Sequence, residues 1–314
     1  MQSRRTVMKG LAAGLSTLAM RALSAKIAAR AAAAGQITLG GDLTVNRMGF
    51  GALRILGPGL HGYPENPKQA RDLLRRVIDL GVNLIDTADA YGPYVSEELI
   101  YQALYPYPRG LVIATKGGLI RPGPNPEDSD GSPEHLRQAC EGSLKRLHLE
   151  RIDLYQLHIP DPKRPIEESV GALKRLQDEG KIRHIGVSNV NLDQLRRAQS
   201  VAKIVSVQNR FNINYRASDE VLKVCEQQRL VFLPWAPLGR ALGAAVDAAP
   251  EGPDKLAPLE AKYHLSPQQA ALAWLLARSR QIAVIPGTAE EAHLEANVAA
   301  AAVRFTVADM AAVA

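Results

Sequence analysis

The sequence predicts an α/β fold, a closed (β/α)8 barrel preceded by a short β-hairpin. Two patterns over residues 35–314 carry this prediction: eight short apolar runs alternate with amphipathic helical segments, and the runs are almost continuously apolar. Continuous apolar runs are typical of parallel strands that helices cover. The alternative is an open doubly wound sheet, but no GxGxxG follows the first run, which counts against that fold.

The predicted elements follow one another in regular order. Residues 37–45 (ITLGGDLTV) hold two β-type runs around a Gly-Gly turn, which predicts the hairpin. Ser-Pro pairs at 132–133 and 266–267 predict helix starts, and Gly81 and Gly180 predict helix ends. The strand runs are RMGF (47–50), VNLID (82–86), LVIAT (111–115), IDLYQL (152–157), HIGV (184–187), IVSVQ (204–208), VFLPW (231–235) and IAVIP (282–286). The clearest helical segments are 70–81, 132–147, 169–180 and 266–279.

Two long connections, 57–67 and 117–131, are rich in proline and glycine and follow the first and third predicted strands. In a barrel, loops that follow strands lie at the carboxyl face, where substrates bind. Their length and position therefore predict that both form the rim of a pocket.

Composition excludes several classes of function. Apolar residues make up 46% and charged residues 22%, as in a globular protein with a sizeable core. The net charge is +6, but residues 1–34 hold six basic and no acidic residues, so the remainder has 38 − 6 = 32 basic against 32 acidic residues. A neutral body gives no overall electrostatic footprint for nucleic acid. Cys140 and Cys225 match no metal-ligand spacing and are expected to be buried thiols. The seven histidines form no HxH or HExxH pair, so a metal-dependent barrel hydrolase ranks last and no metal is predicted.

Residues 3–20 (SRRTVMKGLAAGLSTLAM) combine an arginine pair, a lysine and a modestly apolar run. They resemble a twin-arginine export signal. The run from Gly10 to Met20 is too short to span a bilayer, and Ala32–Ala34 offer an A-x-A cleavage site. We therefore expect a signal peptide over 1–34 and a mature domain over 35–314. The protein would engage the export machinery transiently and reach the periplasm or the medium. The alternative is a basic extension on a cytoplasmic protein.

Four residues that can carry chemistry fall at successive strand ends. Asp86, Lys116 and His158 end the second, third and fourth predicted strands, and Tyr91 lies in the loop after the second. Each alone has a structural explanation, but on a barrel all four converge on one rim. A buried Lys116 keeps its charge beside Asp86. We expect that ammonium to lower the pKa of Tyr91 from its usual value of about 10. Tyr91 could then protonate a carbonyl oxygen, and His158 could polarise it.

With these residues in place, the chain resembles an aldo-keto reductase over residues 36–301. VNLIDTADAYG, VIATKGG and IDLYQLHIPDP are similar to the segments that carry the family's Asp, Tyr, Lys and His, here Asp86, Tyr91, Lys116 and His158. The resemblance implies hydride transfer from a nicotinamide cofactor, usually NADPH with NADH as the alternative, to a small aldehyde or ketone. It implies that Tyr91 is the general acid.

The segments GKIRHIGVSN, SVQNRFN, PWAPLG and IPGTAEEAHLEANVAA resemble the family's cofactor-binding stretches. The resemblance places the carboxamide against Ser188, Asn189 and Gln208, and the nicotinamide ring against Trp235, where the family more often has tyrosine. The other implied contacts are Gly51 and Ala52 with the nicotinamide, Leu238, Gly239 and Arg240 with the pyrophosphate, and Gly287, Thr288, His293 and Asn297 with the adenosine phosphate.

Three positions depart from the family's pattern. Many relatives carry lysine at position 287 and arginine at 293 to hold the 2′-phosphate, and a glutamate at 296 to contact adenine, whereas this chain has Gly287, His293 and Ala296. Arg240 is the candidate to compensate.

GFGALRILGPGLHG and DAYGPYVSEELIYQALYPYP are similar to the branch of the family that contains microbial pyridoxal reductases, which makes pyridoxal the first candidate substrate. The alternative function, from a different class, is a regulatory protein that senses nicotinamide nucleotides on the same barrel. The sequence does not indicate an oligomeric state or the physiological direction of the reaction.

Overall fold

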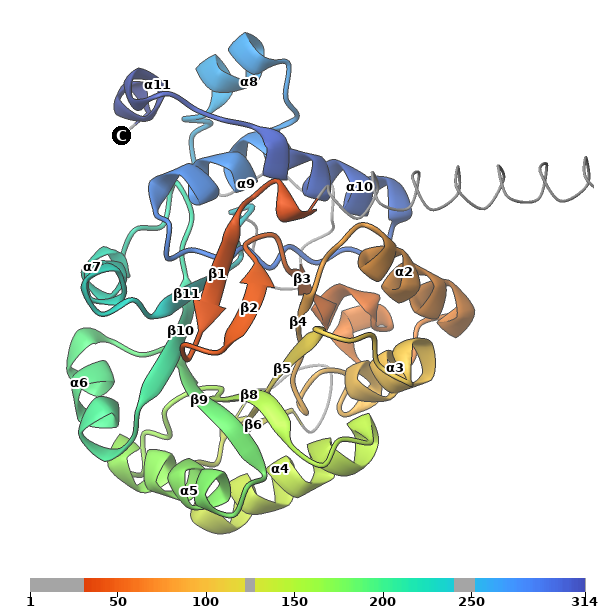
Figure 1. The fold of residues 1–314 in the computed structure, drawn as a ribbon, viewed down its shortest axis with the longest axis vertical. Coiled ribbons are helices and arrows are strands. Elements are labelled where there is room, and N and C mark those ends of the chain that lie inside the picture. The colour runs from red at the N-terminus through yellow and green to blue at the C-terminus, as the bar shows by residue number, and fades with distance from the viewer. Residues whose placement is uncertain (1–30, 122–127, 240–251, 314) are drawn as a thin grey trace, which may run out of the picture.

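The computed structural model describes residues 31–121, 128–239 and 252–313. Within them, seven parallel strands form one curled sheet in the order β11-β10-β9-β8-β5-β4-β3, and helices surround it (Figure 1). This confirms the predicted fold class. The strands are β3 (Phe50–Gly51), β4 (Leu84–Asp86), β5 (Val112–Gly117), β8 (Ile152–Leu157), β9 (Ile182–Ser188), β10 (Ile204–Arg210) and β11 (Val231–Trp235).

The eighth predicted strand closes the barrel without forming a regular ladder. Residues 282–286 join the two edges of the sheet through isolated parallel bridges, Ile282 with Phe232 and Val284 with Met48. The Gly51 N–H donates to the Pro286 carbonyl at 3.1 Å. Regular pairing stops here because β3 is only two residues long and proline has no N–H to donate. We call this junction the seam.

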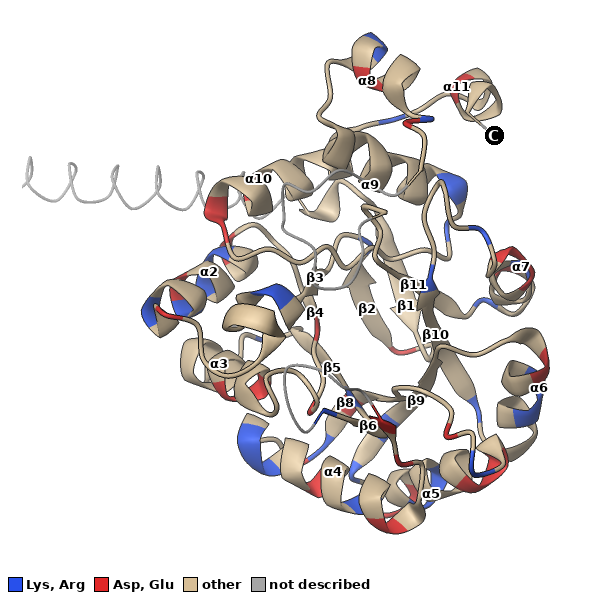
Figure 2. Ribbon diagram, turned by 180° about the vertical axis from the view of Figure 1, so that it is seen from behind, with Lys and Arg blue, Asp and Glu red and all other residues tan. Residues whose placement is uncertain are grey.

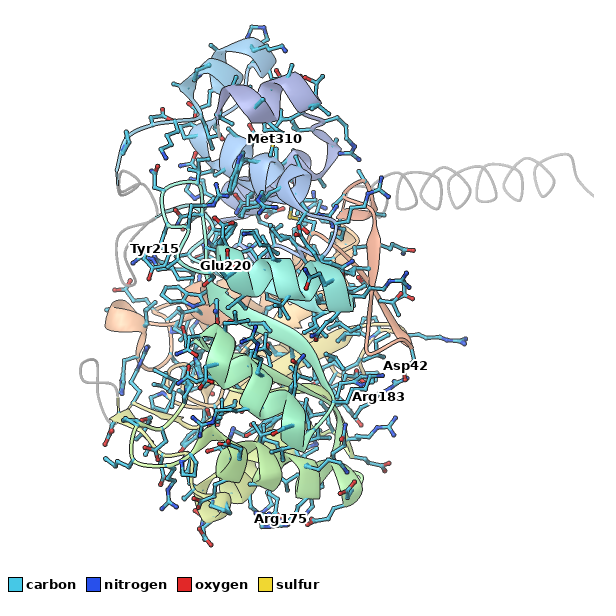
Figure 3. All side chains as sticks on the ribbon, turned by 90° about the vertical axis from the view of Figure 1, so that its left-hand side faces the viewer. Asp42, Arg175, Arg183, Tyr215, Glu220 and Met310 are labelled. Atoms are coloured by element: carbon cyan, nitrogen blue, oxygen red, sulfur yellow. The ribbon has the colours of Figure 1, made fainter. Side chains whose placement is uncertain are left out.

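The predicted hairpin is confirmed as β1 (Gln36–Leu39) and β2 (Leu43–Asn46). It crosses one end of the barrel (Figure 1), and its inner side chains Ile37, Leu39, Leu43 and Val45 belong to the same apolar cluster as the barrel interior. Gly40 has φ +64°, and a Cβ there would lie 2.1 Å from the His184 ring, so only glycine fits this turn. Asp42 in the turn pairs with Arg183 and His184, and Figure 3 shows Asp42 beside Arg183.

The helices form the outer layer, and the predicted helix signals operate as expected. The Ser132 and Ser266 hydroxyls accept from the N–H groups of His135 and Gln269. Figure 2 shows charged residues of both signs along these helices and few on the strands. The helices are α2 (Pro67–Asp79), α3 (Val95–Leu104), α4 (Pro133–Leu147), α5 (Ile166–Asp178), α6 (Leu192–Val201), α7 (Asp219–Gln228), α8 (Ala257–Tyr263), α9 (Pro267–Arg278), α10 (Glu291–Ala299) and α11 (Val307–Ala312).

The two long loops differ in what they contribute. The loop after β5 carries a small antiparallel pair, β6 (Leu119–Ile120) and β7 (Asp128–Ser129), and supplies Leu119 and Arg121 to the cavity described below. The loop over 57–67 lines no part of that cavity, so its prediction as a rim is wrong. Instead, the Gly62 N–H donates to the Gly92 carbonyl at 2.8 Å, so this loop supports the turn that carries Tyr91.

Both cysteines are buried free thiols. Among the described residues, none of the helices is both long and apolar enough to cross a membrane.

Candidate active site

The structure brings Asp86, Tyr91, Lys116 and His158 together at the carboxyl end of the strands. Lys116 lies in β5 and is fully buried. Its Nζ lies 2.7 Å from Asp86 Oδ2, 2.8 Å from the Thr87 carbonyl oxygen and 3.2 Å from Tyr91 Oη. The lysine therefore connects the carboxylate at the end of β4 to the phenol in the next loop.

Two amides complete the surroundings of Asp86. Nε2 of Gln208 donates to Asp86 Oδ1 at 2.8 Å, and Nε2 of Gln156 approaches the same oxygen at 3.3 Å. Asp86 is 2% exposed, so these donors replace the water that a carboxylate normally requires. Sequence reasoning assigned Gln208 to the cofactor and did not identify Gln156, which lies inside β8 among apolar residues.

The charges of the site follow from burial and from Lys116. Burial lowers the pKa of Lys116, but Asp86 and Tyr91 outweigh it and hold that pKa above its ordinary value. Burial raises the pKa of Tyr91 despite the opposing effect of Lys116, so the sequence-based prediction of a lowered pKa is wrong. Burial, Lys116 and Arg121 together hold the pKa of His158 well below its ordinary value. At neutral pH the site therefore holds a neutral imidazole, a neutral phenol and an ammonium ion.

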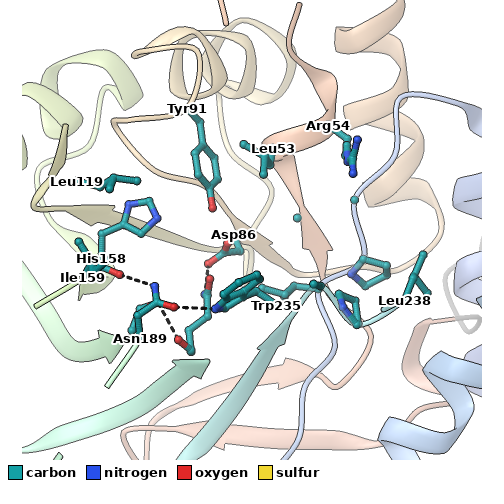
Figure 4. A pocket seen from close by; sticks show the side chains of 18 of the residues that line it. Leu53, Arg54, Asp86, Tyr91, Leu119, His158, Ile159, Asn189, Trp235 and Leu238 are labelled. Atoms are coloured by element: carbon teal, nitrogen blue, oxygen red, sulfur yellow. Dashed lines mark hydrogen bonds between the residues drawn. The ribbon is translucent and has the colours of Figure 1, made fainter. Parts of the chain in front are cut away.

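Tyr91 and His158 face one cavity from the same side (Figure 4). Their ring centroids lie 5.7 Å apart in an edge-on arrangement. The cavity has a volume of about 320 Å³. Of the residues predicted from sequence it is lined by Gly51, Asp86, Tyr91, His158, Ser188, Asn189, Gln208, Trp235, Leu238 and Gly287.

A hydrogen-bonded layer crosses the floor of the cavity. Nδ2 of Asn189 donates to the His158 carbonyl at 2.9 Å, and Nε1 of Trp235 donates to Asn189 Oδ1 at 2.9 Å (Figure 4). The Ser188 hydroxyl donates to the Gln208 carbonyl at 2.7 Å. Asn189 adopts φ +58°, a left-handed conformation that asparagine tolerates better than most residues. Three strand ends are thereby tied to the loop that follows β8.

Gly51 and Gly287 meet across the seam beside Arg54, which lies on the opposite side of the cavity from His158 (Figure 4). A Cβ on Gly287 would lie 2.6 Å from the Gly51 carbonyl oxygen and 3.4 Å from Cγ of Arg54. Position 287 therefore cannot accept the lysine of many relatives without a backbone shift. The half-buried Arg54 lies against this glycine and lines the cavity, so it brings a cation to this end.

The remaining predicted residues that the structure describes lie outside this cavity. Lys116 and Ala52 are buried behind it, and Gly239 lines an adjoining cavity. The Thr288 hydroxyl accepts from the Glu290 N–H before α10, Asn297 is buried in that helix, and His293 is exposed on it. Arg240 lies outside the described residues. Sequence reasoning did not identify the lining residues Leu53, Arg54, Leu119, Arg121, Ile159, Ala236, Pro237, Ile285 and Pro286.

Fold and site together define a (β/α)8-barrel protein whose pocket holds a tyrosine paired with a buried lysine. The family model "Aldo/keto reductase family" matches residues 47–314, so the chain belongs to the aldo/keto reductase family.

Relatives and solved structures agree with this family. The chain is 42% identical to an uncharacterized oxidoreductase of Schizosaccharomyces pombe, over 91% of each chain. It is 39% identical to pyridoxine 4-dehydrogenase of Escherichia coli, over 83% of this chain and 91% of that one. A glycerol dehydrogenase from Gluconobacter oxydans superposes with a TM-score of 0.76 at 27% identity, covering 89% of this chain and 94% of that one. An aldo/keto reductase from Klebsiella pneumoniae, in complex with NADP and acetate, gives 0.73 at 26% identity over 88% and 93%.

Proposed function

We propose that the protein is an NADP(H)-dependent oxidoreductase that reduces an aldehyde or ketone to the alcohol, with Tyr91 as the proton donor. The observation that carries this proposal is the position of Lys116 Nζ, within hydrogen-bond distance of both Asp86 and Tyr91 Oη beneath the cavity. Family membership and the NADP and NADPH complexes of the Klebsiella pneumoniae structures support the choice of cofactor.

The residues present fit a dinucleotide in two respects. Gly51 and Gly287 leave bare backbone at one end of the cavity, where any side chain would obstruct a close approach. Trp235 and the layer of Ser188 and Asn189 provide an aromatic face and polar atoms on the floor. Bound there, the reduced nicotinamide would supply a hydride to the carbonyl carbon.

Residues of the chain would donate the proton and stabilise the negative charge that develops on the carbonyl oxygen. The neutral imidazole of His158 retains one N–H, which can donate to the carbonyl oxygen and orient it. Tyr91 gives its proton to the oxygen as the alkoxide forms. The Lys116 ammonium stabilises the resulting phenolate, and Asp86 keeps that lysine charged. Because the pKa of Tyr91 is raised, its phenol stays protonated until the proton is transferred to the forming alkoxide.

The finer assignment is the substrate, for which we propose pyridoxal, reduced at its aldehyde. The similarity to pyridoxine 4-dehydrogenase supports it. The side chains of Leu53, Leu119 and Ile159 give the cavity apolar surface against which the ring of such an aldehyde can pack.

We also propose export by the twin-arginine route, supported by the sequence of residues 1–34. Residues 1–30 lie outside the described residues. Ala34 is buried and its carbonyl accepts from Arg47 at 3.4 Å, so cleavage after it would expose an edge of the domain. Cell fractionation with sequencing of the mature amino terminus tests the proposal, and a full-length protein confined to the cytoplasm would refute it.

The decisive experiment for the enzyme measures NADPH and NADH oxidation by the purified protein with pyridoxal and simple aldehydes. Tyr91→Phe should lose at least about a hundredfold in turnover, the usual range for a general acid, while NADPH still quenches tryptophan fluorescence. Tyr105→Phe is the matched control, because Tyr105 is 54% exposed. Tight NADPH binding without turnover of any carbonyl would favour the nucleotide-sensing alternative.

A further inference from the structure

A second cavity lies beside α9 and shares no lining residue with the catalytic cavity. Its volume is about 870 Å³. The walls are the carboxyl-terminal half of α9, the segment 303–310, which includes part of α11, and residues 32–36, which lead into β1. Of residues 32–36, Gly35 and Gln36 would remain after the proposed cleavage, and all the arginines of the cavity lie in the mature domain. Figure 3 shows Met310 of this segment at the end of the molecule far from α5. The proposed reductase reaction makes no use of this cavity.

The side chains that line the cavity carry more positive than negative charge. Five arginines line it and, among the described residues, no aspartate or glutamate does. Two of the five, Arg216 and Arg278, are paired with Asp219, which lies outside the wall. The other three have no carboxylate partner in the described part of the chain: Arg47, Arg280 and Arg304. We call these three the arginine triad.

Arg47 is fixed at the inner end of the triad. It is 9% exposed, and its Nε and Nη2 donate to the carbonyls of Ile282 and Leu276, both at 2.8 Å. Burial, followed by repulsion from Arg280 and Arg304, lowers the pKa of Arg47 to about 10. All three guanidiniums line the same cavity, which is therefore positive.

The outer members remain accessible from solvent. Arg280 is exposed, and Arg304 is exposed while it donates to the carbonyls of Ala301 and Val303 at 2.7 and 2.8 Å. Guanidinium groups present several N–H donors in a planar fork that matches phosphate and carboxylate oxygens. Trp274 and Phe305 supply apolar surface to the same cavity. A ligand with charged oxygens at one end and a carbon skeleton would satisfy both surfaces.

We propose that the arginine triad is a binding site for a ligand that carries at least two phosphate or carboxylate groups. More than one negative charge is required because three guanidiniums lack a carboxylate partner. Because Arg47 is recessed, the charged group that reaches it must be small enough to enter the cavity. Such a group can belong to a free small molecule or to the head group of an anionic lipid.

The test titrates the full chain with pyrophosphate and with citrate by calorimetry at low salt. No nucleotide is added, because NADP⁺ carries three phosphates and would itself compete for the triad; only the part of the binding that the triad variant loses is assigned to the triad. A parallel arm measures sedimentation with vesicles of cardiolipin, whose head group carries two phosphates, in phosphatidylcholine, and with phosphatidylcholine vesicles alone. The variant is Arg280→Gln/Arg304→Gln, because Arg47 also holds the seam. The matched control is Arg109→Gln/Arg151→Gln, since both of these arginines are exposed and far from the cavity in sequence.

We expect binding of a soluble anion or of the anionic vesicles, weakened about tenfold or more by the triad variant and unchanged by the control. Binding of soluble anions identifies a free ligand as the source, and binding of anionic vesicles alone identifies a lipid. NADPH turnover and thermal unfolding of the triad variant should match the parent, which shows that the loss is local. Absence of binding in both arms overturns the proposal, and so does binding that is equally strong in the parent and in the triad variant.

Discussion

Replacing Lys116 by methionine would leave the Asp86 carboxylate buried without its cation. The carboxylate is 2% exposed and would keep only the two amide donors. Removing one partner of a buried ion pair costs about 3–5 kcal/mol, because the remaining charge stays desolvated. Turnover should also fall by about 10²–10⁴, because the phenolate of Tyr91 loses its stabilising ammonium.

A second variant separates the structural effect from the catalytic one. In Lys116→Met/Asp86→Asn the buried charge is gone, so most of the lost stability should return, whereas turnover should stay at the level of the single variant. Urea unfolding at pH 7 gives the stabilities, and NADPH oxidation gives the rates. A double variant no more stable than the single one would refute this account of Asp86.

Three further outcomes are expected. Burial raises the pKa of Asp89 to about 8, so the folded state holds a proton that the unfolded state releases above about pH 4. Stability should therefore fall by up to about 1.4 kcal/mol per pH unit between pH 4 and 8, and Asp89→Asn should flatten that slope in urea melts. Gly287→Lys should weaken NADPH binding and destabilise the protein by about 1–3 kcal/mol, because its Cβ meets a backbone carbonyl. Gly171→Lys, in α5, where a Cβ would make only ordinary contacts with Arg175 and Val201, should show neither effect. Trp235→Phe should keep the aromatic face but lose the donor to Asn189, at a cost of about 1 kcal/mol in stability; an unchanged melting curve would contradict this.

The regular parts of the fold were predictable because their signals are local. Continuous apolar runs, Ser-Pro helix starts and the Gly-Gly turn each depend on a few adjacent residues, and all are confirmed. The eighth strand was predicted at the right place but not in its irregular form. Its pairing depends on how few partner residues β3 offers, which no single segment reveals. The loop over 57–67 was misassigned because length and composition do not indicate which way a loop folds.

The residues of the site likewise divide into those that the sequence identifies and those that it does not. Residues at strand ends were identifiable, because barrel topology alone brings the ends of β4, β5 and β8 to one face. Gln156 was not identifiable, because a single amide side chain within an apolar strand gives no signal in the sequence that it binds a catalytic carboxylate. Arg54 and Arg121 lie in loops whose course the sequence does not determine. The direction of the Tyr91 pKa was missed because burial, the largest influence on it, emerges only from the assembled structure.

The seam also determines how late in synthesis the barrel can close. Residues 282–286 are the last of the eight barrel segments to be synthesised, yet they hold the first segment in place through Met48 and Gly51. Until these residues have left the ribosome, the edge of the sheet at Gly51 has no partner strand, and Gly287 is not in place to line the cavity. A sheet formed by the early segments alone would therefore have an unpaired edge, which favours association with other chains. Completion of the cofactor pocket is consequently an event that follows translation of nearly all of the chain.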